Sequence, residues 1–274
     1  MSQESAYIQE QREKVLNQET ATNSTPTNVD RVNSDGYLDF KWGSCPLSLE
    51  DGTLTIHAGK MEFDPAATED ANRIFELLQS DAVTAINVGD GVVFPNPPEN
   101  GGLNSIFMIA SHVTPIRVSK GAILPDNSAT LFALIPNVTS IIFEDGIDST
   151  NVTNMEGMFA WVPKLESLDL SGLDTRNVTD MSAMFQQFMF PDPDQNKLKK
   201  ITFGSKFNTS NVTDMGVMFA GNRDLKSLDL SGFDTSNVTN MSGMFLMNDN
   251  LKSLDISSFD TRKAVGLTTS GGKN

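Results

Sequence analysis

The chain has 274 residues, a formal net charge of −15, one cysteine and two histidines. An acidic surplus of this size repels nucleic acid and anionic lipid, so neither is an expected partner. A single cysteine excludes an internal disulfide framework and a cysteine-rich zinc site. The sequence contains no run of 18 apolar residues, so direct membrane insertion is not expected.

Residues 1–35 are predicted to be a flexible polar segment. Residues 5–20 are rich in Gln, Glu, Lys and Arg and favour a short helix, whereas residues 20–35 have the Thr/Asn/Ser composition of a linker. Met1 to Gln18 lacks the apolar stretch of a signal peptide. Two alternatives stay open: a cytosolic protein, or an exported protein whose signal lies outside this chain.

Residues 36–128 are predicted to form a mostly β capping domain. Alternation of apolar and polar residues, together with flanking turn residues, predicts strands at 37–42, 53–58, 82–89 and 106–110. A short helix is expected at 72–78.

Residues 129–262 form a repeat region, with one degenerate unit and four clear ones. The motif Asn-Val-Thr-Asn/Asp-Met-x-x-Met-Phe begins at Asn151, Asn177, Asn211 and Asn237. A fixed period of about 26 residues is typical of a solenoid, whose units bury their apolar faces against one another. We therefore predict a leucine-rich-repeat-like solenoid, with one parallel strand and one short helical turn per repeat. Residues 263–274 lose the pattern and are expected to be a flexible tail.

The third clear unit shows how one repeat is predicted to fold. Leu225, Leu228 and Leu230 have the leucine-rich-repeat spacing of inward-pointing strand residues. The Met-x-x-Met-Phe segment places its apolar side chains at i, i+3 and i+4, which is one face of a helical turn. Asp214 precedes that segment and is replaced by Asn in other copies, as expected of a capping acceptor.

Two further positions predict hydrogen bonds that recur in each repeat. The corner after each strand carries an Asp or Asn that favours an Asx-turn; these residues are Asp148, Asp174, Asn208, Asp234 and Asp260. The first Asn of the motif is the same in all four copies. This predicts a ladder of amide hydrogen bonds from coil to coil.

The segment from Leu225 to Phe245 and its copies resemble the BspA-like leucine-rich-repeat surface proteins of Gram-positive bacteria and mycoplasmas. The resemblance covers residues 129–262. A weaker similarity at residues 42–46 and 52–59 is to the segment that precedes such repeats in lactic-acid bacterial proteins. The resemblance implies secretion, a place at the cell wall surface, and adhesion to host or matrix surfaces.

The second unit is eight residues longer than its neighbours, and most of the extra length lies at 186–197. Insertions in solenoids become loops, often on a binding face. This loop offers a candidate ligand contact because its apolar side chains are followed by acidic ones; the residues are Phe188, Met189, Phe190, Asp192 and Asp194. In the alternative, the two phenylalanines fold back and cover the side of the solenoid.

The outward strand positions form a second candidate contact surface. One predicted column holds Ile142, Asp169, Thr202, Asp229 and Asp255, and the other holds Ser140, Ser167, Lys200, Ser227 and Ser253. Adjacent carboxylates in such a column repel mildly and favour a cation or basic ligand. The alternative is a solvated face with screened charges.

The sequence contains no recognisable nucleophile–base motif, phosphate-binding loop or zinc-binding helix, so we expect no enzyme activity, cofactor or metal. Cys45 and His57 are expected to be structural. The predicted function is a monomeric interaction module that adheres to a host or extracellular-matrix protein or glycan. Two alternatives stay open: a rigid stalk with binding elsewhere, and a glycan-binding or enzymatic cleft in the capping domain.

Overall fold

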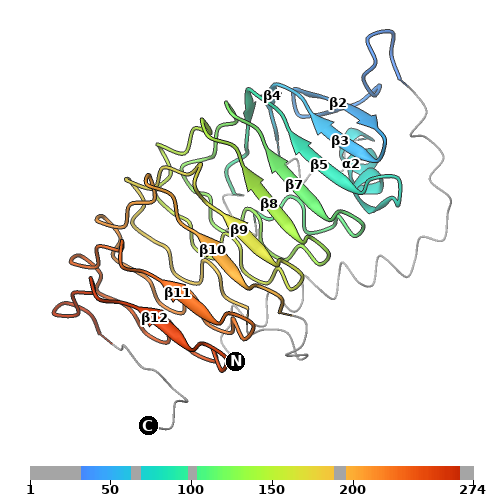
Figure 1. Cartoon of the computed structure of the whole chain (residues 1–274). Coiled ribbons are helices and arrows are strands. Elements are labelled where there is room, and N and C mark those ends of the chain that lie inside the picture. The colour runs from blue at the N-terminus through green and yellow to red at the C-terminus, as the bar shows by residue number, and fades with distance from the viewer. Residues whose placement is uncertain (1–31, 63–68, 98–103, 188–195, 266–274) are drawn as a thin grey trace.

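The computed structural model describes residues 32–62, 69–97, 104–187 and 196–265. The chain winds into stacked coils, and each coil contributes a short strand to one long face (Figure 1). The strands are β1 (Lys41–Trp42), β2 (Cys45–Glu50), β3 (Thr53–Ile56), β4 (Gly59–Lys60), β5 (Ala85–Val88), β6 (Val92–Val93), β7 (Pro115–Val118), β8 (Ser140–Phe143), β9 (Ser167–Asp169), β10 (Lys200–Thr202), β11 (Ser227–Asp229) and β12 (Ser253–Asp255). The helix is α2 (Glu69–Gln79).

The main sheet has the order β1-β2-β3-β5-β7-β8-β9-β10, and two-stranded sheets are formed by β11-β12 and β4-β6. All pairs from β3 onward are parallel, whereas β1, β2 and β3 pair antiparallel. The prediction of a parallel solenoid is therefore confirmed. The antiparallel hairpin covers the edge of β3, which would otherwise be an open template for pairing.

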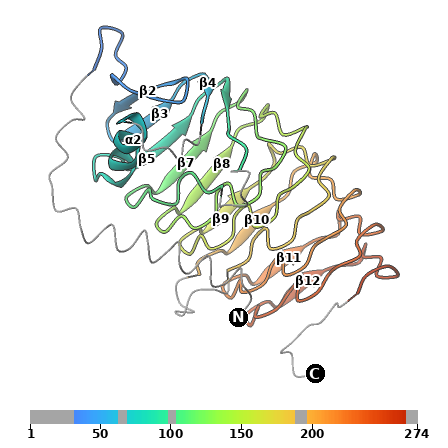
Figure 2. The same cartoon turned by 180° about the vertical axis from the view of Figure 1, so that it is seen from behind.

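The parallel sheet begins within the region predicted as a separate capping domain. β3, β5 and β7 continue without interruption into β8, and one apolar core extends from Leu38 to Phe245. α2 contains the predicted helix and buries Ile74, Leu77 and Leu78 at this end of the stack (Figure 2). The sheet therefore has no structural break at residue 128.

The prediction of a strand at 106–110 is wrong, because these residues form a turn. Their short apolar run belongs to a coil that lacks the Met pair of the later repeats. Phe107 nevertheless stacks on Phe132, with ring centroids 6.0 Å apart. The apolar run was ambiguous in sequence, since short apolar segments fit a strand or a buried turn equally well.

A column of buried phenylalanines runs through the turn side of the coils. Successive ring centroids lie 6.0, 5.9, 5.9, 5.3 and 6.0 Å apart. We call this column the phenylalanine ladder; it consists of Phe107, Phe132, Phe159, Phe185, Phe219 and Phe245. Each ring fills the space above the previous one, so no coil buries its aromatic side chain alone.

The Met-x-x-Met-Phe segments form consecutive hydrogen-bonded turns, not the predicted helical turn. In the first copy, Met158 N–H donates to the Met155 carbonyl. The next N–H, that of Phe159, donates to the Met184 carbonyl in the following coil. Alternate N–H groups therefore bond within the turn and between coils. The left-handed backbone at Gly157 (φ 57°) and Trp161 (φ 56°) makes this alternation possible. A helix would have directed every N–H along its own axis.

The predicted Asp and Asn acceptors are confirmed. At the turn, Asp214 accepts the N–H of Gly216, and at the corner Asp234 accepts the N–H of Ser236. The invariant amides of Asn177, Asn211 and Asn237 also bond from coil to coil, but to main-chain carbonyls and not to one another. Asn211 Nδ2, for example, donates to the Arg176 carbonyl at 2.7 Å.

A hydroxyl ladder at the corner was not anticipated from sequence. Thr209 Oγ1 donates to the Asp234 carbonyl and accepts the Asp234 N–H, at 2.9 and 2.8 Å. Ser149, Thr175 and Thr235 make the same double contact with the following coil. The recurring Asp-Thr pair was its signal in the sequence.

Cys45 is fully buried, and burial raises the pKa of its thiol to about 11. The ring of His57 contacts Tyr37 and is hydrogen-bonded through Nε2 to Ser48 Oγ at 2.8 Å. Both residues have the structural roles expected. Among the described residues, no helix is long and apolar enough to cross a membrane.

Candidate functional site: a cleft in the strand face

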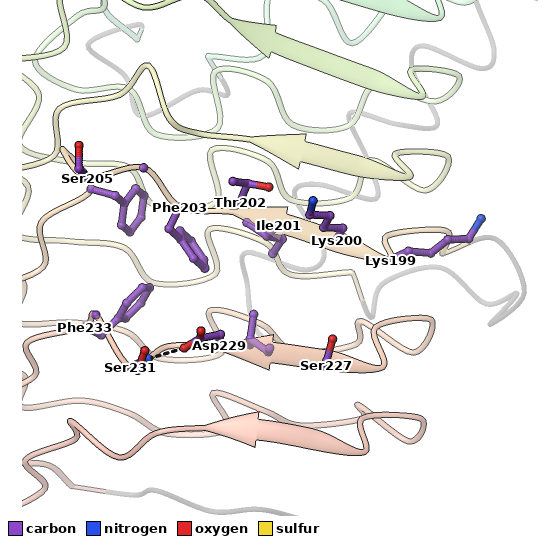
Figure 3. A pocket seen from close by; sticks show the side chains of 14 residues that line it. Lys199, Lys200, Ile201, Thr202, Phe203, Ser205, Ser227, Asp229, Ser231 and Phe233 are labelled. Carbon is purple, nitrogen blue, oxygen red and sulfur yellow. Dashed lines mark hydrogen bonds between the residues drawn. The ribbon is translucent and has the colours of Figure 1, made fainter.

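The strand face opens between β10 and β11. On either side, Leu170 N–H donates to the Thr202 carbonyl and Leu230 N–H donates to the Asp255 carbonyl, both at 2.9 Å. The equivalent bond, from Phe203 N–H to the Asp229 carbonyl, is not among the hydrogen bonds of the described residues. The sheet therefore divides here (Figure 3).

Glycines at equivalent corners show the same separation. A Cβ placed on Gly172 would lie 2.7 Å from the Glu144 carbonyl oxygen of the preceding coil. A Cβ on Gly232 would meet no heavy atom of the described residues within 4 Å. The coil before Gly232 has therefore moved away at the strand face. The hydroxyl ladder still joins the same two coils through Thr209, so the opening is local.

The corner that follows β10 differs from its neighbours in length. It passes from Phe203 to Phe207 through three residues, whereas the corner after β9 passes from Leu170 to Leu173 through two. The corner after β8 is as long as the one after β10, yet β8 pairs with β9. Thr202 also replaces the aspartate that caps the corner in neighbouring coils. The corner after β10 also differs from the one after β8 in carrying two aromatic rings, Phe203 and Phe207.

The resulting cleft has a volume of about 600 Å³. It is lined by Lys199, Lys200, Ile201, Thr202, Phe203, Gly204, Ser205, Phe207, Ser227, Leu228, Asp229, Ser231, Gly232 and Phe233. Its inner wall is aromatic, since Phe203 lies 4.8 Å from Phe207 and 5.1 Å from Phe233 between ring centroids. Among these rings, Phe203 remains partly exposed.

The cleft carries opposite charges at its two ends. Lys199 and Lys200 lie toward the start of β10, and Asp229 lies at the end of β11 (Figure 3). Hydrogen bonds from the hydroxyl and the N–H of Ser231 lower the pKa of Asp229, so this carboxylate stays ionised at neutral pH. Lys199 pairs loosely with Glu166, at 3.4 Å between Nζ and Oε2.

The structure brings some predicted contact residues together and separates others. Thr202 and Asp229 line the cleft from opposite sides. Asp169 aligns with Thr202 in the sheet register, and Asp255 aligns with Asp229. The two predicted columns are therefore continuous within each sheet and interrupted at the cleft. The predicted loop contacts Phe188, Met189, Phe190, Asp192 and Asp194 lie outside the described residues.

The carboxylates of the column also have a structural task. Asp169, Asp229 and Asp255 each accept the N–H of the residue two positions on. For Asp169, hydrogen bonds from Ser171 lower the pKa, and the nearby charge of Lys200 lowers it further. The aspartates of the predicted column therefore cap the corners after their strands and also lie on the exposed face. The cleft itself was not predicted.

A second cavity, of about 650 Å³, lies where the N-terminal coils meet the first repeats. Its lining includes Lys60, Glu62, Phe94, Asp126 and Asn151. Within the described part of the chain, no group of three His, Cys, Asp or Glu side chains is placed to hold a metal ion.

The repeats match a known family model, described as "Mycoplasma protein of unknown function, DUF285", at residues 130–189 and 187–269. Together these matches span just over half of the chain. The chain belongs to this family. Comparison with curated proteins gives no match. Among solved structures, a leucine-rich repeat protein from Eubacterium ventriosum is similar at 13% identity, over 79% of this chain and 84% of that one, with a TM-score of 0.25. The fold described above therefore rests on the observed coils.

Proposed function

We propose that the chain is a cell-surface or secreted bacterial module that binds a host or extracellular-matrix protein through its strand face. The observation that carries the proposal is this exposed face, polar along its columns and apolar where the cleft opens. Exposed apolar sites with a polar rim are typical of protein interaction surfaces. The predicted surface location and the BspA-like resemblance support the same proposal.

The strand face offers a rigid, repeated array. Ser167, Ser227 and Ser253 are exposed at one outward position, and Asp229 and Asp255 at the next. Parallel strands are spaced about 4.8 Å apart, so a partner meets polar side chains at fixed intervals. A rigid array needs little ordering on binding, which favours affinity. We infer a non-catalytic module, acting as a monomer and without a cofactor.

The test measures binding of the complete chain to immobilised fibronectin, collagen and mucin. In one variant, Ser167→Arg and Ser253→Arg place bulky cations on the strand face. The control, Ser242→Arg, places the same side chain in an exposed turn. We expect at least tenfold weaker binding for the strand-face variant and native binding for the control. Equal binding of all three proteins would reject the strand face, and no binding to any of the three ligands would reject matrix adhesion.

A rigid spacer is the second candidate, favoured by hydrogen bonds that join coils along several sides. Besides the strands, parallel bridges run through Asn154, Asp180, Asp214 and Asn240. Such coupling gives a stiff rod. Under this alternative, native binding would persist in both arginine variants, while insertion of two extra repeats would change only the reach of the protein.

A further inference from the structure

The cleft exposes side chains that the neighbouring interior coils bury. At the central inward strand position, Ile116, Ile141 and Leu168 are at most 1% exposed, whereas Ile201 is only partly buried. At the next inward position, Leu170 and Leu230 are fully buried and Phe203 is not. Solvent therefore reaches the core at this interior coil. Covering apolar surface of this kind is favourable because it removes that surface from water.

The cleft also exposes main-chain groups. In a parallel ladder, a strand directs alternate residues to each neighbour, so Ile201 and Phe203 face the gap from one side and Asp229 faces it from the other. Their ladder bonds are missing between the described strands. The backbone of an extended peptide would match these donors and acceptors if it lay between the two strands.

The width of the cleft limits how a peptide enters. A complete strand inserted between β10 and β11 would need the two to be about 9.6 Å apart, twice the usual spacing. At their closest, Cα atoms of these strands lie within 8 Å of each other. A side chain fits where a backbone does not. A cavity of about 600 Å³ has the size of a typical small-ligand pocket.

We propose that the cleft between β10 and β11 receives one apolar side chain from an extended segment of a partner protein. In that segment, an acidic residue flanks the anchor on the side of Lys200 and a basic residue flanks it on the side of Asp229. Residues two apart in an extended chain share a face and lie about 7 Å apart. The three side chains therefore meet the cation, the apolar wall and the carboxylate in turn. This inference rests on the proposed function and specifies the partner chemistry.

The test uses two fluorescein-labelled peptides of nine residues, otherwise all threonine. The first has glutamate third, phenylalanine fifth and lysine seventh; the second exchanges the glutamate and the lysine. Fluorescence anisotropy is measured with the complete chain. We expect at least a fivefold preference for one peptide, because only one order matches the two charges in the bound direction. The double variant Lys200→Glu, Asp229→Lys reverses that preference.

A second pair of variants tests the cleft without changing its charges. Gly232→Phe fills the cleft from a position where the added side chain meets open space, so we expect at least tenfold weaker binding of the preferred peptide. Gly232→Ala is the matched control and binds as the native chain does. Circular dichroism melts establish that each variant folds. If the double charge variant does not fold, Lys200→Glu alone is expected to bring the preference close to one.

The outcomes separate this inference from the proposed function. If neither peptide binds while the chain still binds a matrix protein, the cleft proposal is overturned and the interaction function stands. If a peptide binds as expected but no matrix protein does, the cleft proposal stands and matrix adhesion fails. Equal affinity for both peptides, or a preference unchanged in the charge variant, also overturns it. The same holds if the cleft binds a chitin oligosaccharide, with loss in Gly232→Phe, and neither peptide.

Discussion

Replacing Phe219 by alanine tests whether neighbouring coils stabilise one another. Phe219 is fully buried, and its ring centroid lies 5.3 Å from Phe185, 6.0 Å from Phe245 and 6.5 Å from Phe203. Truncating a buried phenylalanine costs roughly 3–5 kcal/mol, to which each stacked pair contributes about 0.5–1.5 kcal/mol. We expect Phe219→Ala to lower the free energy of unfolding by about 4 kcal/mol.

The measurement combines urea unfolding with hydrogen exchange. The surface control is Ile142→Ala, a side chain 37% exposed, for which we expect less than about 1 kcal/mol. In a solenoid, each coil contacts only its neighbours, so exchange should accelerate at the amides of Phe185 and Phe219. Amides of β3 should keep their native protection. A double-mutant cycle with Phe185→Ala should give a coupling of about 1 kcal/mol.

Two results would refute the reasoning. A cost below about 1 kcal/mol would mean that the ring is not packed as described. Equal loss of protection in β3 and in the neighbouring coils would mean that the stack unfolds as one body, without local coupling.

Three further predictions concern single positions. Gly204→Ala places a Cβ 2.4 Å from the main chain of the preceding coil, whereas the Cβ of Gly232→Ala meets open space. We expect only Gly204→Ala to lower the free energy of unfolding, by about 1–3 kcal/mol, as measured by thermal melting. Equal melting temperatures of the two variants would contradict this packing. Asn222→Ala removes two buried hydrogen bonds, each 2.8 Å long, that the Asn222 amide donates to the main-chain carbonyls of Phe185 and Phe219. We expect the free energy of unfolding in urea to fall by about 1–3 kcal/mol. A change below about 0.5 kcal/mol would be inconsistent with those bonds. For Asp234, hydrogen bonds from Ser236 lower the folded pKa below its usual value of about 3.9. The stabilisation is therefore complete above about pH 4 and is lost as pH falls through the lowered pKa. Asp234→Asn should flatten the dependence of the melting temperature on pH below about pH 4, and an unchanged slope would reject the assignment.

Much of one coil was predictable because its determinants are local. The spacing of Leu225, Leu228 and Leu230 predicted inward strand residues, and all three are buried. The Asp/Asn exchange at Asp214 predicted a side-chain acceptor, and the acceptor is present. Such patterns depend on residues a few positions apart, so the sequence alone determines them.

Local rules were insufficient where a segment had two compatible folds. The spacing of Met215, Met218 and Phe219 fits a helical turn, yet the segment forms turns whose N–H groups bond to the next coil. The stretch from Ile106 to Ala110 fits a strand, yet it forms the same kind of turn. In both, the choice depends on carbonyl groups that the neighbouring coil presents. Periodicity in the segment itself contains no information about them.

By itself, then, the sequence determined the repeat, the inward side chains, the capping acceptors and the two outward columns. Only the tertiary structure decided that the parallel sheet begins at β3 and that the strand face opens between β10 and β11. The start of the sheet depends on coils too degenerate to share a motif, which are recognised by stacking alone. The opening lies where one coil meets the one after it, some 26 residues along the chain, and no motif within either coil marks it. Interactions between coils, not within them, set both features.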